Sequence, residues 1–167
     1  DQGNDRIQVF DSQGRFLRKW GREGSSNEEF SWTQGVAIDS EGNVYVSDRG
    51  NHRIQVFDSQ GRFLRKWGRR GSGDGEFSQP QGVAVDRDGN IYVADVENHV
   101  IRKIAVTDGV ITTIAGTGRR GNAIEEGGLA TSAQLDNPRN VAFYDGKLYI
   151  LDSGNNRVLE VILATGI

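Results

Sequence analysis

The sequence predicts an all-β fold, a β-propeller segment built from four-stranded antiparallel blades. The first observation is an internal repeat, because residues 1–10 recur nearly unchanged at 48–57 and more loosely at 95–104 and 152–161. The second is that short apolar-polar alternations, separated by glycine-containing turns, fill each repeat. Short strands repeated at a period in the forties are typical of propeller blades.

Each complete repeat is expected to hold four strands in a meander, since tight turns separate the alternating segments. We letter these strands a, b, c and d, from the central channel outward. Residues 6–22 recur identically at 53–69, so the chain opens on strands c and d of one blade. The expected strands after that opening pair cover 35–39, 44–47, 53–57, 62–67, 83–85, 91–93, 101–104, 110–114, 140–143 and 147–151, followed by a further strand c.

The chain is therefore interpreted as one segment, 1–167, with repeats at 1–47, 48–94 and 95–151 and an extra strand within 152–167. Three blades do not close a ring, because propellers typically have 4–8. The segment is either cut from a longer propeller or closes a six-bladed ring as a homodimer, and we favour the homodimer. Strand c would then be supplied twice at each junction, so we expect one copy of it to be displaced.

Composition narrows the class of protein. The net charge is −3, which provides no global attraction to nucleic acid or an anionic surface. No apolar run is long enough for a membrane helix, so no membrane partner is expected. Cysteine is absent, which excludes disulfides and thiolate sites but leaves the compartment open. Methionine is also absent, and repeats are identical even at polar positions, which points to an excised piece, recent duplication or engineering.

Three motifs of the second repeat, at 35–39, 43–48 and 50–57, together resemble the NHL repeat, which is named for an Asn-His-Leu-like stretch. Here that stretch reads Asn-His-Arg at 51–53 and Asn-His-Val at 98–100. The first two repeats resemble tripartite-motif NHL proteins, and the third is more similar to bacterial NHL proteins. The resemblance implies a six-bladed propeller that mostly binds protein or RNA on one face. A minority of the family, the peptidyl-hydroxyglycine lyases, are metal-dependent enzymes.

The candidate ligand surface lies where the d-to-a and b-to-c connections emerge together, around the channel mouth. The alternative is that these residues form the turns, since Asn and Asp satisfy local backbone groups and tolerate left-handed geometry. That structural role is the alternative interpretation for each residue taken alone. The ten candidates are Gln34, Arg49, Asn51, His52, Gln81, Asn98, His99, Arg139, Asn155 and Asn156.

Recurring acidic and basic residues invite a catalytic interpretation, but a structural one is simpler. Asp48, Asp95 and Asp152 end strand b, and an arginine begins strand c at positions 6, 53 and 157. We expect these carboxylates to accept turn amides or to pair with arginine. The two histidines are expected to be solvated loop residues, because repeat-equivalent positions rarely converge on one ion. No metal, cofactor or enzymatic site is predicted.

The predicted function is that of a non-enzymatic propeller scaffold or binding module that associates with itself to close a ring. The alternative is recognition of single-stranded RNA or peptide by the loops, where Trp32 could stack a base among several arginines. Acidic residues in the same loops weaken a phosphate-binding groove. A metal-dependent, amidating-lyase-like enzyme is the remote alternative. Trp20 and Trp67 are expected to pack between blades, with Val36, Val83, Val141, Tyr45, Tyr92 and Tyr149 in the core.

Overall fold

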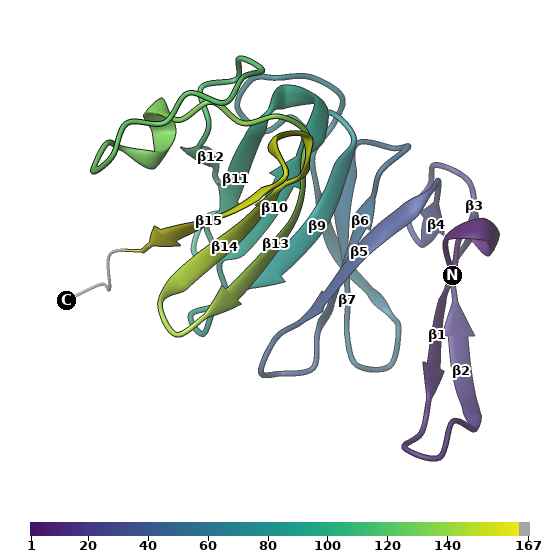
Figure 1. Cartoon of the computed structure of the whole chain (residues 1–167). Coiled ribbons are helices and arrows are strands. Elements are labelled where there is room, and N and C mark those ends of the chain that lie inside the picture. The colour runs from purple at the N-terminus through teal and green to yellow at the C-terminus, as the bar shows by residue number, and fades with distance from the viewer. Residues whose placement is uncertain (164–167) are drawn as a thin grey trace.

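A computed structural model describes residues 1–163 and contains two complete four-stranded sheets side by side (Figure 1). Both are antiparallel meanders in chain order, which confirms the predicted blade. Blade 1 consists of β5 (Thr33–Ile38), β6 (Val44–Asp48), β7 (Arg53–Phe57) and β8 (Phe63–Trp67). Blade 2 consists of β9 (Pro80–Val85), β10 (Ile91–Asp95), β11 (Val100–Ile104) and β12 (Ile111–Ala115).

Incomplete sheets flank these two blades. Blade 3 has three strands, β13 (Pro138–Tyr144), β14 (Lys147–Asp152) and β15 (Arg157–Ile162). The N-terminal hairpin pairs β1 (Ile7–Phe10) with β2 (Phe16–Trp20). By repeat alignment the hairpin supplies strands c and d, and blade 3 supplies a, b and c, as predicted. Residues 164–167 of the predicted extra strand lie outside the described residues.

The connections contain small parallel pairings that the sequence did not predict. A parallel pair, β3 (Arg22–Glu23) and β4 (Glu29–Phe30), closes the connection into blade 1. Single parallel bridges, Arg70 to Phe77 and Arg120 to Leu135, hold the corresponding connections into blades 2 and 3. Four 3-10 turns complete the described structure: Gln2–Asn4, Val96–Asn98, Ala130–Ser132 and Ser153–Asn155. None of the helical turns in the described residues could cross a membrane.

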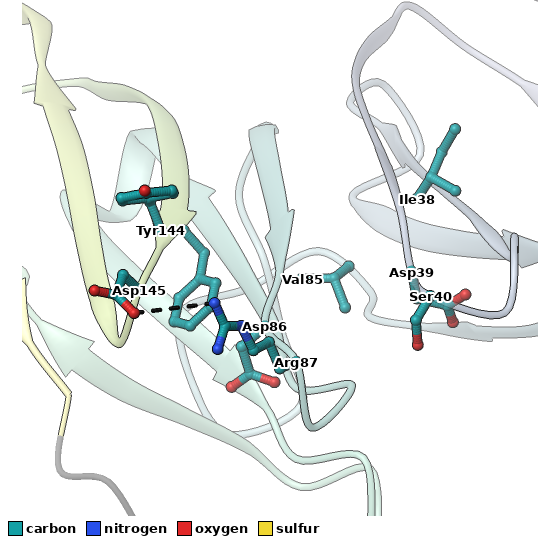
Figure 2. Close-up of a pocket in the computed structure, with 9 residues that line it drawn as sticks. Ile38, Asp39, Ser40, Val85, Asp86, Arg87, Tyr144 and Asp145 are labelled. Carbon is teal, nitrogen blue, oxygen red and sulfur yellow. Dashed lines mark ion pairs between the residues drawn. The ribbon is translucent and has the colours of Figure 1, made fainter.

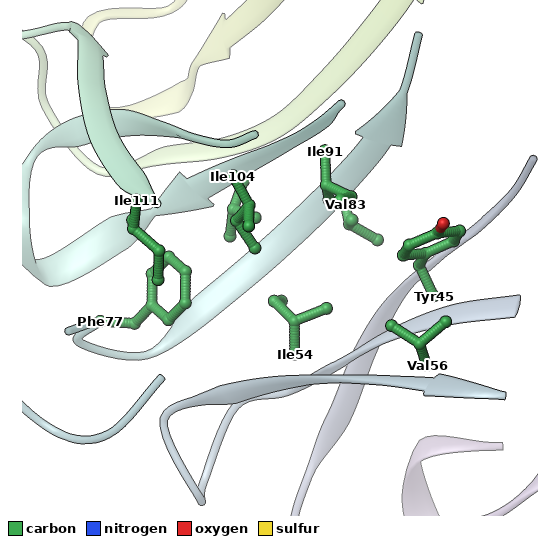
Figure 3. Close-up of a cluster of buried hydrophobic side chains, with 9 residues drawn as sticks. Tyr45, Ile54, Val56, Phe77, Val83, Ile91, Ile104 and Ile111 are labelled. Carbon is green, nitrogen blue, oxygen red and sulfur yellow. The ribbon is translucent and has the colours of Figure 1, made fainter. Parts of the chain in front are cut away.

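The hydrophobic core is divided into layers between neighbouring sheets. Figure 3 shows the layer in which Tyr45, Ile54 and Val56 of blade 1 face Val83 and Ile91 of blade 2. Ile54 is fully buried, and burying a side chain of this size stabilises a fold by about 1.5–3 kcal/mol. The fold therefore depends on contact between successive blades, and a blade without a neighbour leaves one face uncovered.

Outer-strand tryptophans pack between neighbouring sheets, as predicted. Trp20 of the hairpin lies 5.9 Å from Phe57 of blade 1, measured between ring centroids. Trp67 packs against the layer between blades 1 and 2. Phe57 is fully buried and also contacts Phe30 and Phe63, so this aromatic group anchors the hairpin to blade 1.

The prediction that Val36 lies in the core is wrong, since its side chain is 58% exposed. The residues at the same repeat position, Val83 and Val141, are 6% and 4% exposed. The difference arises because the hairpin supplies only strands c and d, so residues 1–163 place no strands a and b against Val36. Tyr149 is half-buried because the described residues contain no following blade to cover it, whereas Tyr45 and Tyr92 are buried.

Candidate functional site: the loop face

The loop face is the end of the arc where two sets of connections meet, at the upper end of Figure 1. All ten predicted site residues lie in these connections or at the first positions of the strands that follow. The d-to-a connections cover 21–32, 68–79 and 116–137, and the b-to-c turns cover 49–52, 96–99 and 153–156.

The three asparagines of the b-to-c turns hold the loop face together. In each blade the side-chain amide donates to a glycine carbonyl oxygen of the preceding d-to-a connection, at 2.8 Å. The same amide also donates to the aspartate that ends strand b. These contacts occupy the amide hydrogens that a ligand would use. The residues concerned are Asn51, Asn98 and Asn155.

The two histidines connect neighbouring blades. His52 Nδ1 accepts the backbone N–H of Gln79 at 3.1 Å, and His99 Nδ1 accepts that of Asn137 at 3.2 Å. The prediction of solvated histidines is wrong, because both rings are half-buried in these joints. Burial, and then the charge of Arg70, lower the pKa of His52. A low pKa preserves the neutral ring, whose unprotonated nitrogen is the acceptor.

Buried ion pairs lie directly beneath the loop face, which confirms the structural interpretation of the repeated aspartates. Asp48 is fully buried and accepts the Ser31 backbone N–H at 2.7 Å and Arg53 Nε at 2.6 Å. In blade 2 the pair is Asp95 with Arg102, two residues further along strand c than the repeat predicts, because valine occupies position 100. Blade 3 uses Asp152 and Arg157, whose Oδ2 and Nε lie 2.8 Å apart.

An exposed aromatic and basic pair remains on the loop face. Trp32 is 59% exposed, and the Arg49 guanidinium carbon lies 5.5 Å from its ring centroid. Arg49 Nε also donates to Gln79 Oε1 at 2.9 Å, which fixes the guanidinium beside the ring. Gln79 was not predicted as a site residue. The available signal was repeat position, since Trp32 and Gln79 occupy equivalent places and both have positive φ, 55° and 53°.

Four other predicted site residues form no side-chain hydrogen bond or ion pair with one another. The side chains of Gln34, Gln81 and Arg139 form no hydrogen bond or ion pair with any described residue, and they lie at the start of three separate strands. Asn156 is exposed at the tip of the last b-to-c turn. The structure therefore distributes the ten candidates around the loop face instead of bringing them together at one point.

Three arginines in the connections of the loop face pair with carboxylates. Arg22 and Arg69 lie 2.8 Å and 3.0 Å from the carboxylate oxygens of Glu29 and Glu76. A third arginine, at position 120, pairs with an aspartate at 2.9 Å. Such pairing reduces the positive potential that a nucleic-acid backbone requires.

A shallow hollow of about 240 Å³ lies at the opposite end, among the a-to-b turns (Figure 2). The carboxylates of Asp39 and Asp86 belong to their own hairpins, since each accepts from a tyrosine hydroxyl at 3.0 Å and 2.9 Å. Burial, and then Asp39, raise the pKa of Tyr45 to about 12, so its hydroxyl remains a donor at neutral pH. Within residues 1–163 no group of three or more His, Cys, Asp or Glu could hold a metal ion.

Comparison with known proteins supports the propeller architecture. Residues 39–103 match the profile of a family described as a six-bladed β-propeller. No curated protein matches the chain significantly in sequence. The match covers less than half of the chain and does not establish the NHL resemblance.

Several solved structures share the fold at low identity. A protein of unknown function from Bacteroides thetaiotaomicron is 18% identical with a TM-score of 0.67, over 89% of this chain and 51% of its own. An auxiliary nutrient binding protein from Bacteroides ovatus is 20% identical with a TM-score of 0.71, over 95% and 43%. A streptogramin B lyase is 15% identical with a TM-score of 0.65, over 99% and 50%. The chain thus spans about half the length of these proteins, and they indicate its fold alone.

Proposed function

We propose that the chain is an NHL-type, non-enzymatic binding scaffold whose three-blade arc closes into a six-bladed ring with a second copy. The observation that carries the proposal is that the arc ends in two exposed apolar faces, and each end has the strands that the other lacks. The N-terminal end lacks strands a and b, which blade 3 has, and blade 3 lacks strand d, which the hairpin has. Repeat units of this kind gain stability by covering one another's faces.

The N-terminal face centres on strand β5. Val36 and Ile38 are 58% and 65% exposed there, on the side that points toward the missing strands. One blade along, Val83 lies at the position of Val36 and belongs to the buried layer that contains Tyr45. A tyrosine from strand b of a preceding blade is therefore the expected cover for Val36.

The C-terminal face carries such a tyrosine. Tyr149 occupies the repeat position of Tyr45 and points away from blade 2, toward the side on which residues 1–163 contain no further blade. Leu151 and Val158 on the same side are 45% and 64% exposed. Placing this face against β5 of a second copy would reproduce the layer seen between blades 1 and 2. The description of the matching family as six-bladed is consistent with two arcs of three blades.

The test is the solution mass of residues 1–167, measured by light scattering during size exclusion at several concentrations. The expected result is a sharp species at twice the chain mass of 18.4 kDa. Ile38→Lys should abolish it, because the junction would bury an unpaired charge. Val110→Lys is the matched control, since Val110 is 51% exposed but belongs to the c-to-d turn of blade 2. A monomeric wild-type chain at all concentrations would contradict the proposal.

A second candidate function, recognition of a peptide or single-stranded RNA, is favoured by Trp32 and Arg49. An exposed indole beside a fixed guanidinium can stack on a base or an aromatic side chain. The carboxylate pairing of three further arginines, at positions 22, 69 and 120, favours a peptide over RNA.

Fluorescence anisotropy with labelled peptide and RNA pools tests this candidate. Trp32→Ala should remove the binding without changing the free energy of unfolding, because the side chain is mostly exposed. Binding that falls steeply between 50 and 200 mM salt would identify RNA as the ligand. Binding that Trp32→Ala leaves intact would exclude this pair as the recognition site.

A further inference from the structure

The chain contains two copies of strand c at its ends, β1 and β15, although a closed junction has room for one. We propose that β15 remains in its blade while β1 of the second copy is displaced, so that β2 of that copy pairs directly with β15. This inference rests on the ring proposed above and specifies how its junction forms. Three observations on the described residues favour β15.

The first observation is the arginine that begins strand c. Arg157 donates to Asp152 at 2.8 Å and to the carbonyl oxygens of Asn122 and Gln134 at 3.0 Å and 2.8 Å. Arg53 makes the same kind of network in blade 1. Arg6, which directly precedes β1, donates to Asp1 alone among the described residues. Removing β15 would break three bonds to its own blade, whereas removing β1 breaks none of this kind.

The second observation is the joint between blades. Asp5 occupies the repeat position of His52 and accepts the Trp32 backbone N–H at 2.7 Å. Asn156 holds the same position in blade 3 and has the same left-handed backbone, with φ of 52° against 54° for His52. Its side chain is exposed and accepts no hydrogen bond from the described residues. When β1 is displaced, the Trp32 backbone N–H loses its acceptor, Asp5. Asn156 of the other copy can replace Asp5 as the acceptor, so the number of hydrogen bonds between blades is conserved.

The third observation is charge complementarity across the new pairing. In blade 1, Val56 on strand c lies opposite Arg65 on strand d, and in the hairpin Val9 lies opposite Arg18. The same register between β15 and β2 places Glu160, which pairs with Lys147 at 3.0 Å in its own blade, opposite Arg18. Arg18 donates through Nη2 to the Ser59 carbonyl oxygen, but its Nε is buried without a hydrogen-bond partner among the described residues. Exchange of β1 for β15 therefore gives this guanidinium a carboxylate in place of a valine, and opposite charges facing each other stabilise antiparallel pairs.

A disulfide lock tests the exchange in the full chain, which has no other cysteine. Gln8→Cys/Lys19→Cys places the pair on facing residues of β1 and β2, leaves Arg18 unchanged and, when oxidised, should hold β1 in the hairpin. The expected result is loss of the dimer on oxidation and its recovery with reductant, while circular dichroism shows that the locked chain is folded. The complementary variant Glu160→Cys/Arg18→Cys should form a covalent dimer on non-reducing gels.

A charge exchange provides a second test that needs no oxidation. Glu160→Arg and Arg18→Glu should each weaken association several-fold, and the double variant should restore it. If the oxidised lock dimerises as well as wild type, the ring stands but displacement of β1 is refuted. If the double charge variant is no better than either single variant, the pairing of β15 with β2 is refuted. A wild-type chain that is monomeric at every concentration refutes both the ring and the exchange.

Discussion

Replacing Asp48 with alanine is expected to destabilise the chain far more than replacing Asp1, although both hold the same place in the repeat. Asp48 accepts from Asn51, Arg53 and Gln55. Asp1 accepts from the equivalent asparagine, arginine and glutamine at positions 4, 6 and 8. The two networks differ in solvent exposure. The side chains of Asp48 and Arg53 are 0% and 6% exposed, whereas those of Asp1 and Arg6 are 24% and 31% exposed.

The magnitude follows from that difference in burial. Breaking a buried ion pair costs about 3–5 kcal/mol, because the remaining charge stays buried without a partner. An exposed pair contributes about 0.2–1 kcal/mol. One kcal/mol shifts Tm by about 2–4 °C for a chain of this size. Asp48→Ala is therefore expected to lower Tm by about 6–20 °C, and Asp1→Ala by at most about 4 °C.

The assay is urea and thermal unfolding of both variants beside wild type, followed by circular dichroism at one protein concentration. Asp48→Asn is a useful third variant, because it keeps an acceptor for Ser31 and removes the charge. It should fall between wild type and Asp48→Ala. Equal losses for the Asp48 and Asp1 variants would refute the argument, since burial would then have no influence on the value of the pair.

Three further predictions concern single sites. Gly68→Ala should lower the free energy of unfolding by about 2–5 kcal/mol, because φ is +101° and its Cβ would lie 2.4 Å from a buried ring carbon. Gly75→Ala, at φ +77° in open space, should lower the free energy of unfolding by only about 1–2 kcal/mol. If urea titrations gave equal losses for the two variants, the clash of the Gly68→Ala side chain with the buried ring would not be the cause. Burial lowers the pKa of His52 in the folded chain. Its contribution to the free energy of unfolding is therefore complete above a pH of about 6.5 and declines as the pH falls below that value. His52→Asn should flatten this loss of Tm at acid pH, and an unchanged pH profile of Tm would contradict the assigned role of His52. Phe57→Ala should cost about 3–5 kcal/mol and shift Trp20 fluorescence toward the red, because both rings share one buried group; an unshifted spectrum would show that the hairpin does not depend on Phe57.

The blade architecture could be predicted because period, alternation and turn chemistry are local properties of the sequence. The identical segments 6–22 and 53–69 both form a strand-turn-strand hairpin in the same register. Burial could not be predicted in the same way. Phe10 is 52% exposed while its copy Phe57 is fully buried. The copies differ in their neighbouring strands, which lie outside the repeat itself.

The loop face shows the same limit at the level of individual residues. Sequence placed Asn51, His52 and their repeats on one face, and the structure agrees. The sequence could not show that the side chains of these residues already form hydrogen bonds, because their partners are backbone groups of connections about 27 residues away. The partners of Arg49 were hidden for a similar reason, since Trp32 and Gln79 belong to two different connections.

The end faces also determine what kind of assembly can form. Each junction joins the blade 3 face of one copy to the hairpin face of another, which is a heterologous contact. Such contacts close only when the rotation per copy divides a full turn, and otherwise they build open filaments. Three blades of a six-bladed geometry turn by half a circle, so the second copy returns to the first and no face is left. If each blade turned by less, copies would add without closure and the mean mass would rise with concentration. A dimer whose mass does not change with concentration would therefore show that each blade turns by a sixth of a circle, as well as that two copies associate.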